Sequence, residues 1–296
     1  LSLNLVMETK QLGNTDVTIS AIGLGGMPLS LSGRPPESQA IALIHRALDL
    51  GVTLIDTADS YCQDESDKHH NEQLIHKALQ QYDGDTSQVI VATKGGLIRP
   101  QGNWKRNGNP DRLRETIRIS YAALGGSKPI DVWQYHAPDL DYTIEEALQP
   151  AKEAVDAGLI RFVGVSNFSV EQIKRAREVV DIVSVQNQYN PWHRQPEVDG
   201  VLEYCETEKL TFFPWSPLGG RRRVGNLEDI PVIAQLAQEQ GISVYQIVLA
   251  WLRAKSPCIV PIPGASKTSS LDDSVRAVEV KLSPAQVERI DRGTEV

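Results

Sequence analysis

The chain has 296 residues, of which 41% are hydrophobic and 23% charged, and its formal net charge is -8 at pH 7. This composition is typical of a globular protein with an extensive buried core. The acidic balance argues against a general nucleic-acid or anionic-membrane surface, because those partners attract basic faces.

A β-hairpin is predicted over residues 9–20, with its turn at Gly13-Asn14. After it, short runs rich in β-branched and aromatic residues alternate with longer runs of helical periodicity. Strands are predicted over 21–25, 52–57, 89–94, 130–136, 161–167, 182–186, 210–215 and 258–263. Helices are predicted over 37–51, 71–81, 110–125, 143–158, 170–180, 231–241, 243–255 and 282–293. Left-handed C-terminal caps are expected at Gly51, Gly125 and Gly158.

The alternation of strands and helices predicts parallel strands joined by helical crossovers. The strands are nearly continuous apolar runs, which predicts a sheet covered on both faces. Eight such units in 296 residues favour a closed (β/α)8 barrel, the TIM barrel, over an open doubly wound sheet. Since we find no linker, we predict a single domain over 1–296, with the hairpin preceding the barrel.

Two long loops are predicted. The stretch 95–110 follows the third strand and carries Trp104 beside Lys105 and Arg106. A loop of this length fits either a substrate-facing role or disorder. A second, glycine-rich loop, 217–226, follows the seventh strand.

Polar side chains stand where successive predicted strands end. The run LIDTADSY (54–61) places Asp56 at the end of the second strand and Tyr61 just beyond it, while Lys94 ends the third strand and His136 the fourth. Taken singly, these are a turn residue, a rim aromatic, a solvated strand end and a core histidine. The carboxyl ends of barrel strands converge on one mouth, so we expect the four side chains to meet there as a catalytic group.

The chemistry of the four groups is coherent. A tyrosine is a poor acid at neutral pH, because its unperturbed pKa is about 10. We expect the Lys94 ammonium to stabilise the phenolate of Tyr61 and lower that pKa, while Asp56 keeps the lysine charged. His136 would polarise a substrate oxygen or share in the proton transfer.

The ordered motifs LIDTADSY, VIVATKGG, IDVWQYHAPD, GVSNFS, VQNQYN and WSPLGG resemble those of the aldo-keto reductase superfamily, from about Gly13 to the last helix. The IPGA motif near the C-terminus resembles its prokaryotic-type group. This resemblance implies a barrel that binds NADPH across its mouth and reduces aldehydes or ketones to alcohols by hydride transfer. It also implies that Asp56, Tyr61, Lys94 and His136 are the catalytic tetrad, with Tyr61 as the general acid.

The same resemblance implies a set of cofactor-binding residues. Ser166, Asn167 and Gln186 match the positions that bind the nicotinamide carboxamide, and Trp215 matches the aromatic residue that stacks on its ring. Amide side chains suit that role because they present both a donor and an acceptor. Two further groups, with Asp56, complete the set: Gly26 and Met27 near the ribose, and Ser216, Leu218, Gly219 and Arg221 at the pyrophosphate. Alternatively, the arginine run 221–223 is only a solvated charge cluster.

At the adenosine end, Gly264, Ser266 and Lys267 match positions that bind the 2'-phosphate. The sequence departs from the family pattern at Ser270, where an arginine is common. A second departure is Asp273 with Ser274 in place of the usual Glu-Asn pair. Lys267 with two serine hydroxyls still suits a phosphate, so NADPH or NADP+ is favoured over NADH, with dual use as the alternative.

A small carbonyl compound is the expected partner. The long C-terminal loop that narrows the pocket in some family members is expected to be absent, which predicts an open site. Apolar walls suited to aldehydes, ketones or aromatic carbonyl compounds are expected from Met27, Tyr61, Trp104, Trp133, Trp192 and Trp215. Two other functions compete: a regulatory subunit that binds NADPH with little turnover, and a lyase that forms a Schiff base on Lys94. No metal is expected, since His69, His70 and His76 lack HExxH spacing.

The three cysteines, Cys62, Cys205 and Cys258, form no CxxC pair, so no disulfide framework is expected. No run of eighteen apolar residues is present, and the opening residues lack the features of a signal peptide. We therefore predict a cytoplasmic protein, monomeric or a small homo-oligomer, with no nucleic-acid or membrane partner.

Overall fold

The computed structural model describes residues 5–220 and 223–294. The chain begins with the predicted hairpin, in which β1 (Thr9–Gln11) pairs antiparallel with β2 (Thr18–Ser20). The turn is longer than two residues, because Leu12 N–H donates to Val17 C=O. Gly13 within it has a φ of +55°, which favours glycine. The prediction of an N-terminal hairpin is confirmed.

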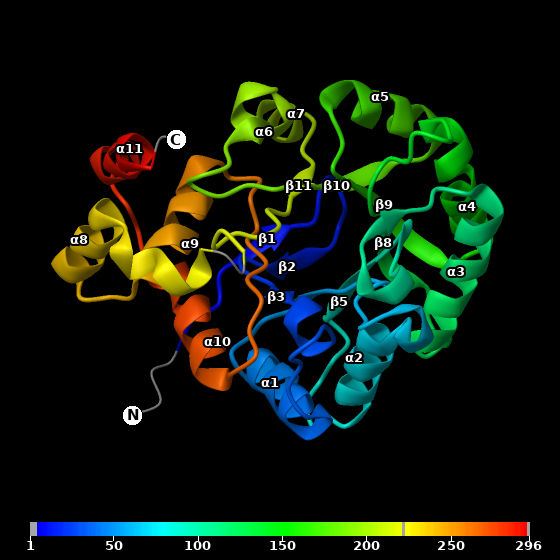
Figure 1. The fold of residues 1–296 in the computed structure, drawn as a ribbon, viewed down its shortest axis with the longest axis horizontal. Coiled ribbons are helices and arrows are strands. Elements are labelled where there is room, and N and C mark those ends of the chain that lie inside the picture. The colour runs from blue at the N-terminus through cyan, green and yellow to red at the C-terminus, as the bar shows by residue number, and fades with distance from the viewer. Residues whose placement is uncertain (1–4, 221–222, 295–296) are drawn as a thin grey trace.

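Seven parallel strands form a curled sheet in the order β11-β10-β9-β8-β5-β4-β3. Their bounds are β3 (Leu24–Gly25), β4 (Leu54–Asp56), β5 (Ile90–Gly95), β8 (Ile130–Tyr135), β9 (Ile160–Ser166), β10 (Ile182–Gln186) and β11 (Thr211–Phe212). The helices lie around the outside of this sheet (Figure 1). The prediction of parallel strands with helical crossovers is thus confirmed.

The eighth predicted strand closes the barrel, although its residues are not part of the regular sheet. The segment 258–264 forms parallel bridges to both outer strands, Gly25 with Gly264 on one side and Phe212 with Ile259 on the other. Pro261 accepts from Gly23 N–H, but its ring nitrogen has no hydrogen to donate in return. Proline therefore explains why this strand pairs through isolated bridges, and closure excludes the open doubly wound alternative.

The predicted helices are all present, within two residues of their expected bounds. They are α1 (Glu37–Asp49), α2 (His70–Gln80), α3 (Pro110–Ala123), α4 (Ile144–Asp156), α5 (Val170–Val179), α8 (Pro231–Gln240), α9 (Val244–Lys255) and α11 (Pro284–Gly293). The caps are also as expected, since Gly51, Gly125 and Gly158 all have positive φ. Three short helices were not predicted: α6 (Gln195–Val198), α7 (Val201–Thr207) and α10 (Thr268–Val275).

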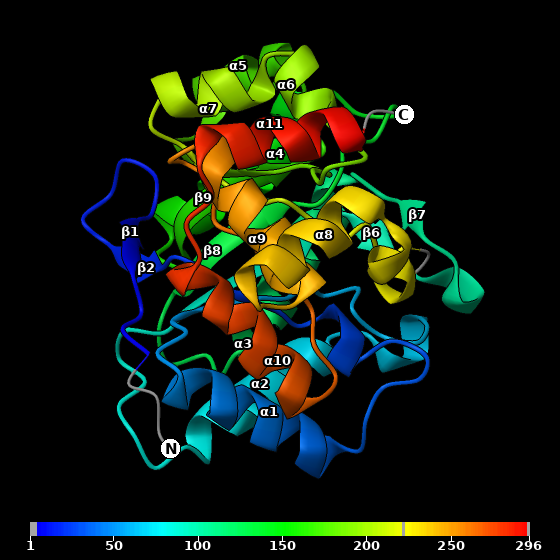
Figure 2. The same ribbon diagram turned by 90° about the vertical axis from the view of Figure 1, so that its left-hand side faces the viewer.

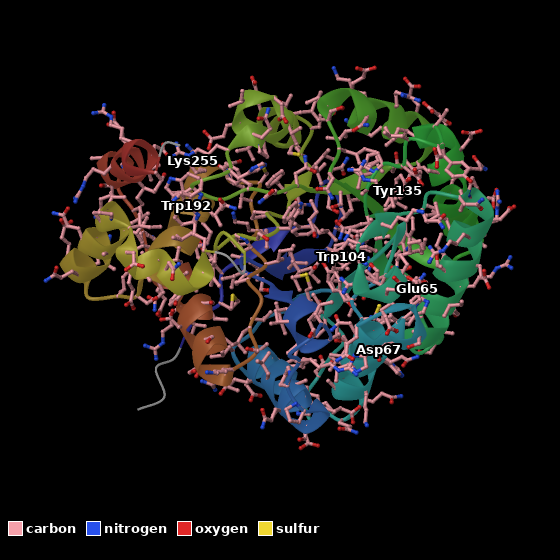
Figure 3. The ribbon with its side chains drawn as sticks, viewed as in Figure 1. Glu65, Asp67, Trp104, Tyr135, Trp192 and Lys255 are labelled. Atoms are coloured by element: carbon pink, nitrogen blue, oxygen red, sulfur yellow. The ribbon has the colours of Figure 1, made fainter. Side chains whose placement is uncertain are left out.

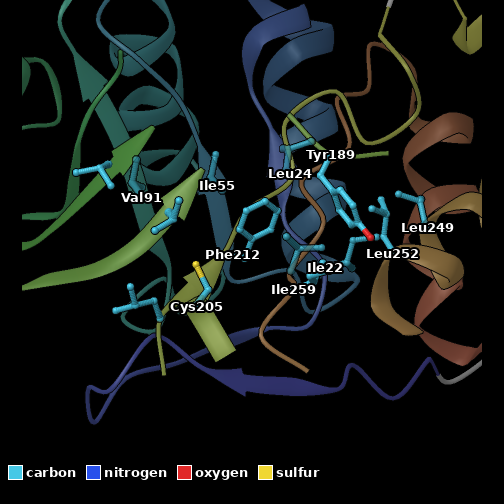
Figure 4. Close-up of a cluster of buried hydrophobic side chains, with 14 of the residues drawn as sticks. Ile22, Leu24, Ile55, Val91, Tyr189, Cys205, Phe212, Leu249, Leu252 and Ile259 are labelled. Carbon is cyan, nitrogen blue, oxygen red and sulfur yellow. The ribbon is translucent and has the colours of Figure 1, made fainter. Parts of the chain in front are cut away.

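Side chains alternate between two hydrophobic clusters along the strands. On β4, Ile55 packs outward in the large cluster between sheet and helices, part of which is shown in Figure 4, whereas Leu54 packs in a smaller inner cluster. Leu12 and Ile19 of the hairpin belong to the inner cluster too. The hairpin therefore closes one end of the barrel, and Figure 2 shows β1 and β2 at the side opposite to β6 and β7.

The stretch after β5, for which disorder and a substrate-facing loop were both considered, is a small ordered hairpin. Here β6 (Leu97–Ile98) pairs antiparallel with β7 (Lys105–Arg106), and the 3-10 helix η3 (Pro100–Gly102) lies between them. Four other 3-10 helices are described: η1 (Met27–Leu29), η2 (Glu65–Asp67), η4 (Val224–Asp229) and η5 (Arg276–Glu279). Over residues 5–220 and 223–294, no helix is both long enough and apolar enough to span a membrane.

Candidate active site

A cavity of about 500 Å³ lies at the carboxyl ends of the strands. Eleven of the predicted site residues line it: Met27, Asp56, Tyr61, His136, Ser166, Asn167, Gln186, Trp215, Ser216, Leu218 and Gly264. They come from segments that are far apart in sequence, as expected when parallel strands end at one mouth. The remainder of the lining is mostly apolar, and of these residues only Trp104 was expected to face the substrate: Gly25, Pro28, Leu97, Trp104, Pro217, Gly220, Val224 and Ile262.

Lys94 lies next to the Asp56 and Tyr61 side chains and is fully buried. Its ammonium group donates to the Asp56 carboxylate, to Thr57 C=O and to Tyr61 Oη, each at 2.8 Å. The carboxylate of Asp56 also accepts from Gln186 Nε2 at 2.8 Å. All three ammonium protons are therefore used, and the lysine is fixed between a carboxylate and a phenol.

The pKa of the Tyr61 phenol is shifted opposite to the expected direction. Burial, followed by the charge of Asp56 and a hydrogen bond to it, raises this pKa well above its usual value. The expectation of a lowered pKa considered only the Lys94 cation and left out the desolvation of a phenolate and its repulsion by Asp56. Tyr61 is therefore a neutral phenol throughout the physiological pH range.

Burial also lowers the pKa of Lys94, and the nearby carboxylates of Asp56, Asp59 and Glu72 oppose that shift. Asp56 contributes most to this opposition, both through its charge and through a hydrogen bond. A buried ammonium is stable only where such partners replace its hydration. The acidic surroundings thus offset part of the effect of burial on the ammonium beside the phenol.

The imidazole of His136 lies beside Tyr61, with 6.0 Å between the ring centroids. Burial and the positive charge of Lys94 lower the pKa of His136 well below its usual value, so the ring is neutral at pH 7. Its Nδ1 has no hydrogen-bond partner among residues 5–220 and 223–294. A neutral imidazole carries one donor and one acceptor, and either can serve a bound molecule.

The polar residues after β9 bond to one another along one side of the cavity. Asn167 donates through Nδ2 to His136 C=O and to Ser166 Oγ, and its Oδ1 accepts from Trp215 Nε1 at 3.0 Å. Asn167 has a φ of +63° and Ser216 a φ of +50°, a conformation uncommon for residues other than glycine. Strained backbone at two cavity positions is typical of functional sites.

Several predicted site residues lie outside the cavity lining. Gly26 is packed beneath it, where its N–H donates to Asp56 C=O and its C=O accepts from Asn71 Nδ2. Gly219 instead lines a neighbouring polar cavity of about 530 Å³. Two expected pocket walls also lie elsewhere, since Trp192 lines that second cavity and Trp133 is fully buried in the large hydrophobic cluster. Arg221 lies outside the described residues.

The adenosine-end residues lie on and beside the first turn of α10. Ser266, Lys267 and Ser270 are exposed there, and Lys267 is the N-cap residue of the helix. The Asp273 carboxylate instead accepts hydrogen bonds from Ser243 Oγ and Gln246 Nε2, each at 2.6 Å. These bonds join α10 to the N-terminal end of α9. The sequence motifs gave no sign of this link, because α10 was not predicted.

In the described parts of the chain, no three His, Cys, Asp or Glu side chains gather closely enough to hold a metal ion. The adjacent histidines are engaged elsewhere: His69 Nδ1 is 2.6 Å from Glu72, and His70 Nδ1 is 2.8 Å from Ser30 Oγ.

The family model described as "Aldo/keto reductase family" matches residues 21–295 of this chain. The chain belongs to the aldo/keto reductase family. It is therefore an oxidoreductase, and aldo/keto reductases act on small carbonyl compounds with nicotinamide cofactors. The superfamily resemblance seen in the motifs and the barrel fold are both confirmed.

Individual relatives agree with this assignment. An uncharacterised oxidoreductase from Schizosaccharomyces pombe is 36% identical over 283 residues, which are 93% of this chain and 87% of that protein. The crystal structure of a thermostable aldo-keto reductase in complex with the inhibitor epalrestat has 32% identity and a TM-score of 0.83, covering 97% of this chain and 100% of that one. The structure of a glycerol dehydrogenase from Gluconobacter oxydans has 25% identity and a TM-score of 0.83, covering 96% of this chain and 94% of that one.

Proposed function

We propose that this aldo/keto reductase is an NADPH-dependent enzyme that reduces aldehydes and ketones to alcohols, with Tyr61 as the proton donor. The observation that carries the proposal is the Lys94 ammonium, hydrogen-bonded at 2.8 Å to both Asp56 and Tyr61. Tyr61 and His136 both line the cavity, so a carbonyl oxygen can lie between the phenol and the imidazole.

The reduced nicotinamide, when bound, supplies the hydride that adds to the carbonyl carbon. Tyr61 gives its proton to the carbonyl oxygen, which becomes an alcohol. Lys94 then stabilises the phenolate through the hydrogen bond it already makes, and Asp56 balances the ammonium charge. The neutral His136 ring is suited to donate a hydrogen bond to the same oxygen before the proton moves.

The raised pKa of Tyr61 suits this role. An alkoxide is a stronger base than a phenolate, so a neutral phenol still transfers its proton downhill once hydride has arrived. A phenol that ionised near pH 7 would lose that proton to solvent before the substrate entered. Burial therefore keeps Tyr61 protonated, and Lys94 stabilises the phenolate that forms when the proton is transferred.

The residues around the cavity fit a nicotinamide dinucleotide. The Trp215 ring lines the cavity together with Ser166, Asn167 and Gln186, which offer a stacking face beside amide and hydroxyl groups. Beyond Trp215, Gly219 and Gly220 both have positive φ, and glycines let backbone N–H groups approach a pyrophosphate closely. The cofactor would thus extend from the tetrad toward α10.

A lyase based on Lys94 is disfavoured by its surroundings. The amine is fully buried, and its three hydrogens are all donated to protein oxygens. A Schiff base requires a deprotonated amine that can reach a carbonyl carbon. Because Lys94 is buried and held by three protein oxygens, it cannot reach a carbonyl carbon in the cavity, and its role is to support Tyr61.

The function is tested by mixing the protein with NADPH and a panel of neutral aldehydes and ketones while following the absorbance of reduced nicotinamide. We expect saturable turnover on at least the activated aldehydes, with one alcohol formed for each NADPH oxidised. Tight NADPH binding without turnover on any carbonyl compound would contradict the proposal and favour a regulatory, cofactor-sensing subunit.

Replacing Lys267 with alanine should weaken NADPH binding about tenfold, the usual scale for one charge-assisted hydrogen bond to phosphate. NADH binding should change less than twofold, because NADH lacks the 2'-phosphate that Lys267 would contact. The dissociation constants are measured by fluorescence titration of the reduced nicotinamides. Lys281→Ala, at another exposed position, is the matched control, and equal weakening of both cofactors would refute this role.

A further inference from the structure

Trp104 is an unusually exposed indole for a residue beside buried catalytic candidates. Among the described residues, the large apolar side chains that are strongly exposed are Val6, Trp104, Ile119, Leu140 and Val198, and of these only Trp104 lines the cavity. Its exposed fraction is 46%, whereas Tyr61 beside it is 6% exposed. An apolar face left open next to a reaction site is a surface that a ligand can cover.

The indole is held in place by Arg99. The guanidinium carbon of Arg99 lies 3.9 Å from the centroid of the Trp104 ring, a close cation–π stack. Arg99 is itself nearly buried, and its Nη2 donates to Gln63 C=O at 3.3 Å. Its backbone N–H donates to the Glu65 carboxylate. Arg99 therefore fixes Trp104 to the segment that follows Tyr61.

Trp104 stands edge-on to both proton-handling rings. Its ring centroid is 6.4 Å from that of Tyr61, at an interplanar angle of 90°, and 6.4 Å from that of His136, at 67°. Figure 3 places Trp104 near the centre of the molecule, with Glu65 to one side. A carbonyl oxygen placed between Tyr61 and His136 therefore directs the rest of its molecule past the indole.

The charge around the cavity limits what that molecule can be. Asp56 is the only acidic side chain among the described lining residues, which include no lysine or arginine, and Asp56 is paired with Lys94. Most of the other lining side chains are apolar, including Leu97, which β6 contributes. A carboxylate or phosphate on the substrate would find no cation among these lining residues and would lose its hydration on entry.

We infer that Arg99 and Trp104 form a substrate clamp, in which Arg99 positions the indole and the indole packs against an uncharged aromatic ring on the substrate carbonyl. The inference rests on the proposed function and names its substrate class: aryl aldehydes and aryl ketones. Trp104 is the specificity-determining residue, and Arg99 is a positioning residue that acts through it. Stacked aromatic pairs favour this class over saturated analogues of equal size.

The clamp is tested with two aldehydes of the same carbon skeleton, benzaldehyde and cyclohexanecarbaldehyde. Trp104→Ala should raise the KM for benzaldehyde about tenfold and that for cyclohexanecarbaldehyde less than threefold, with kcat changed little. Trp104→Phe should restore most of the preference, because it returns an aromatic face. Arg99→Met should shift KM in the same direction by a smaller factor while the melting temperature stays within a few degrees.

Ile119→Ala, which removes an exposed apolar side chain outside the cavity, should alter neither KM. An equal rise in both KM values in Trp104→Ala, or no rise in either, would overturn the clamp.

A binding measurement that needs no turnover separates this inference from the proposed function. Calorimetry compares the affinity of the protein for benzamide with its affinity for cyclohexanecarboxamide. If benzamide binds better and Trp104→Ala removes the difference, the clamp stands even where reduction fails. If carbonyl reduction proceeds but the two amides bind with equal affinity, the clamp is refuted while the proposed reductase function stands.

Discussion

Tyr61→Phe is expected to lower kcat at least about a thousandfold, the upper part of the range for loss of a positioned general acid. The change removes one hydroxyl and keeps the ring, so the contacts of the phenyl face with Trp104 and His136 are retained. The change removes the proposed proton donor, together with the hydrogen bonds that the hydroxyl makes with Lys94 and Asp56. NADPH affinity should stay within about twofold, since the substitution deletes no group proposed to hold the cofactor. Stopped-flow absorbance measures kcat, and fluorescence titration measures the dissociation constant for NADPH.

A surface tyrosine provides the matched control. Tyr82 Oη donates to Asp49 Oδ1 at 2.9 Å on the outside of the barrel, so Tyr82→Phe also removes one hydrogen-bonded hydroxyl. Its kcat should equal that of the wild type. Turnover above one tenth of the wild-type rate in Tyr61→Phe would show that another group delivers the proton, and the assignment of the general acid would be withdrawn.

Lys94→Met should lower the free energy of unfolding by about 3–5 kcal/mol, as is usual when a buried ion pair loses one partner. The cost arises because the Asp56 carboxylate, 3% exposed, would keep its charge with no cation beside it, and only the neutral donors Gln186 Nε2 and Tyr61 Oη are described as bonding to it. Turnover should fall as strongly as in Tyr61→Phe, since a phenolate would form without its cation.

Urea unfolding measures the loss, and a second substitution identifies its cause. In the double variant Lys94→Met/Asp56→Asn no unpaired charge remains, so most of the lost free energy of unfolding should return while turnover stays low. If the double variant is as unstable as the single one, the damage comes from packing rather than from the unpaired carboxylate. A stable, fully active Lys94→Met protein would contradict both roles of the lysine.

The barrel and the meeting of the four polar residues were predictable because both depend on local patterns. Runs such as VIVATK have the length and β-branched content of a buried strand, and parallel strands must end at one mouth. Asp56, Lys94 and His136 each stand at such an end, so their proximity follows from strand order alone. The isolated pairing of 258–264 was harder to anticipate, because Pro261 weakens the ladder without breaking it.

What could not be predicted depends on contacts between distant segments. Asp273 was assigned to the cofactor by its motif position, yet its carboxylate is held by Ser243 and Gln246 of another helix. The direction in which the pKa of Tyr61 is shifted depends on how deeply the phenol is buried, and a strand-end pattern does not give that burial. Arg99 carries no motif at all, and its stacking on Trp104 exists only because β6 and β7 pair.

The hairpin that closes the far end of the barrel has a consequence for how this enzyme can change. Leu12 and Ile19 help to fill the interior from below, so the scaffold is sealed without any help from the loops around the mouth. Those loops are free to accept insertions or exchanged sequences at little thermodynamic cost. Grafting a different segment in place of 96–107 removes the contacts of Arg99 with Gln63 and Glu65, and it should change substrate preference while the barrel stays folded.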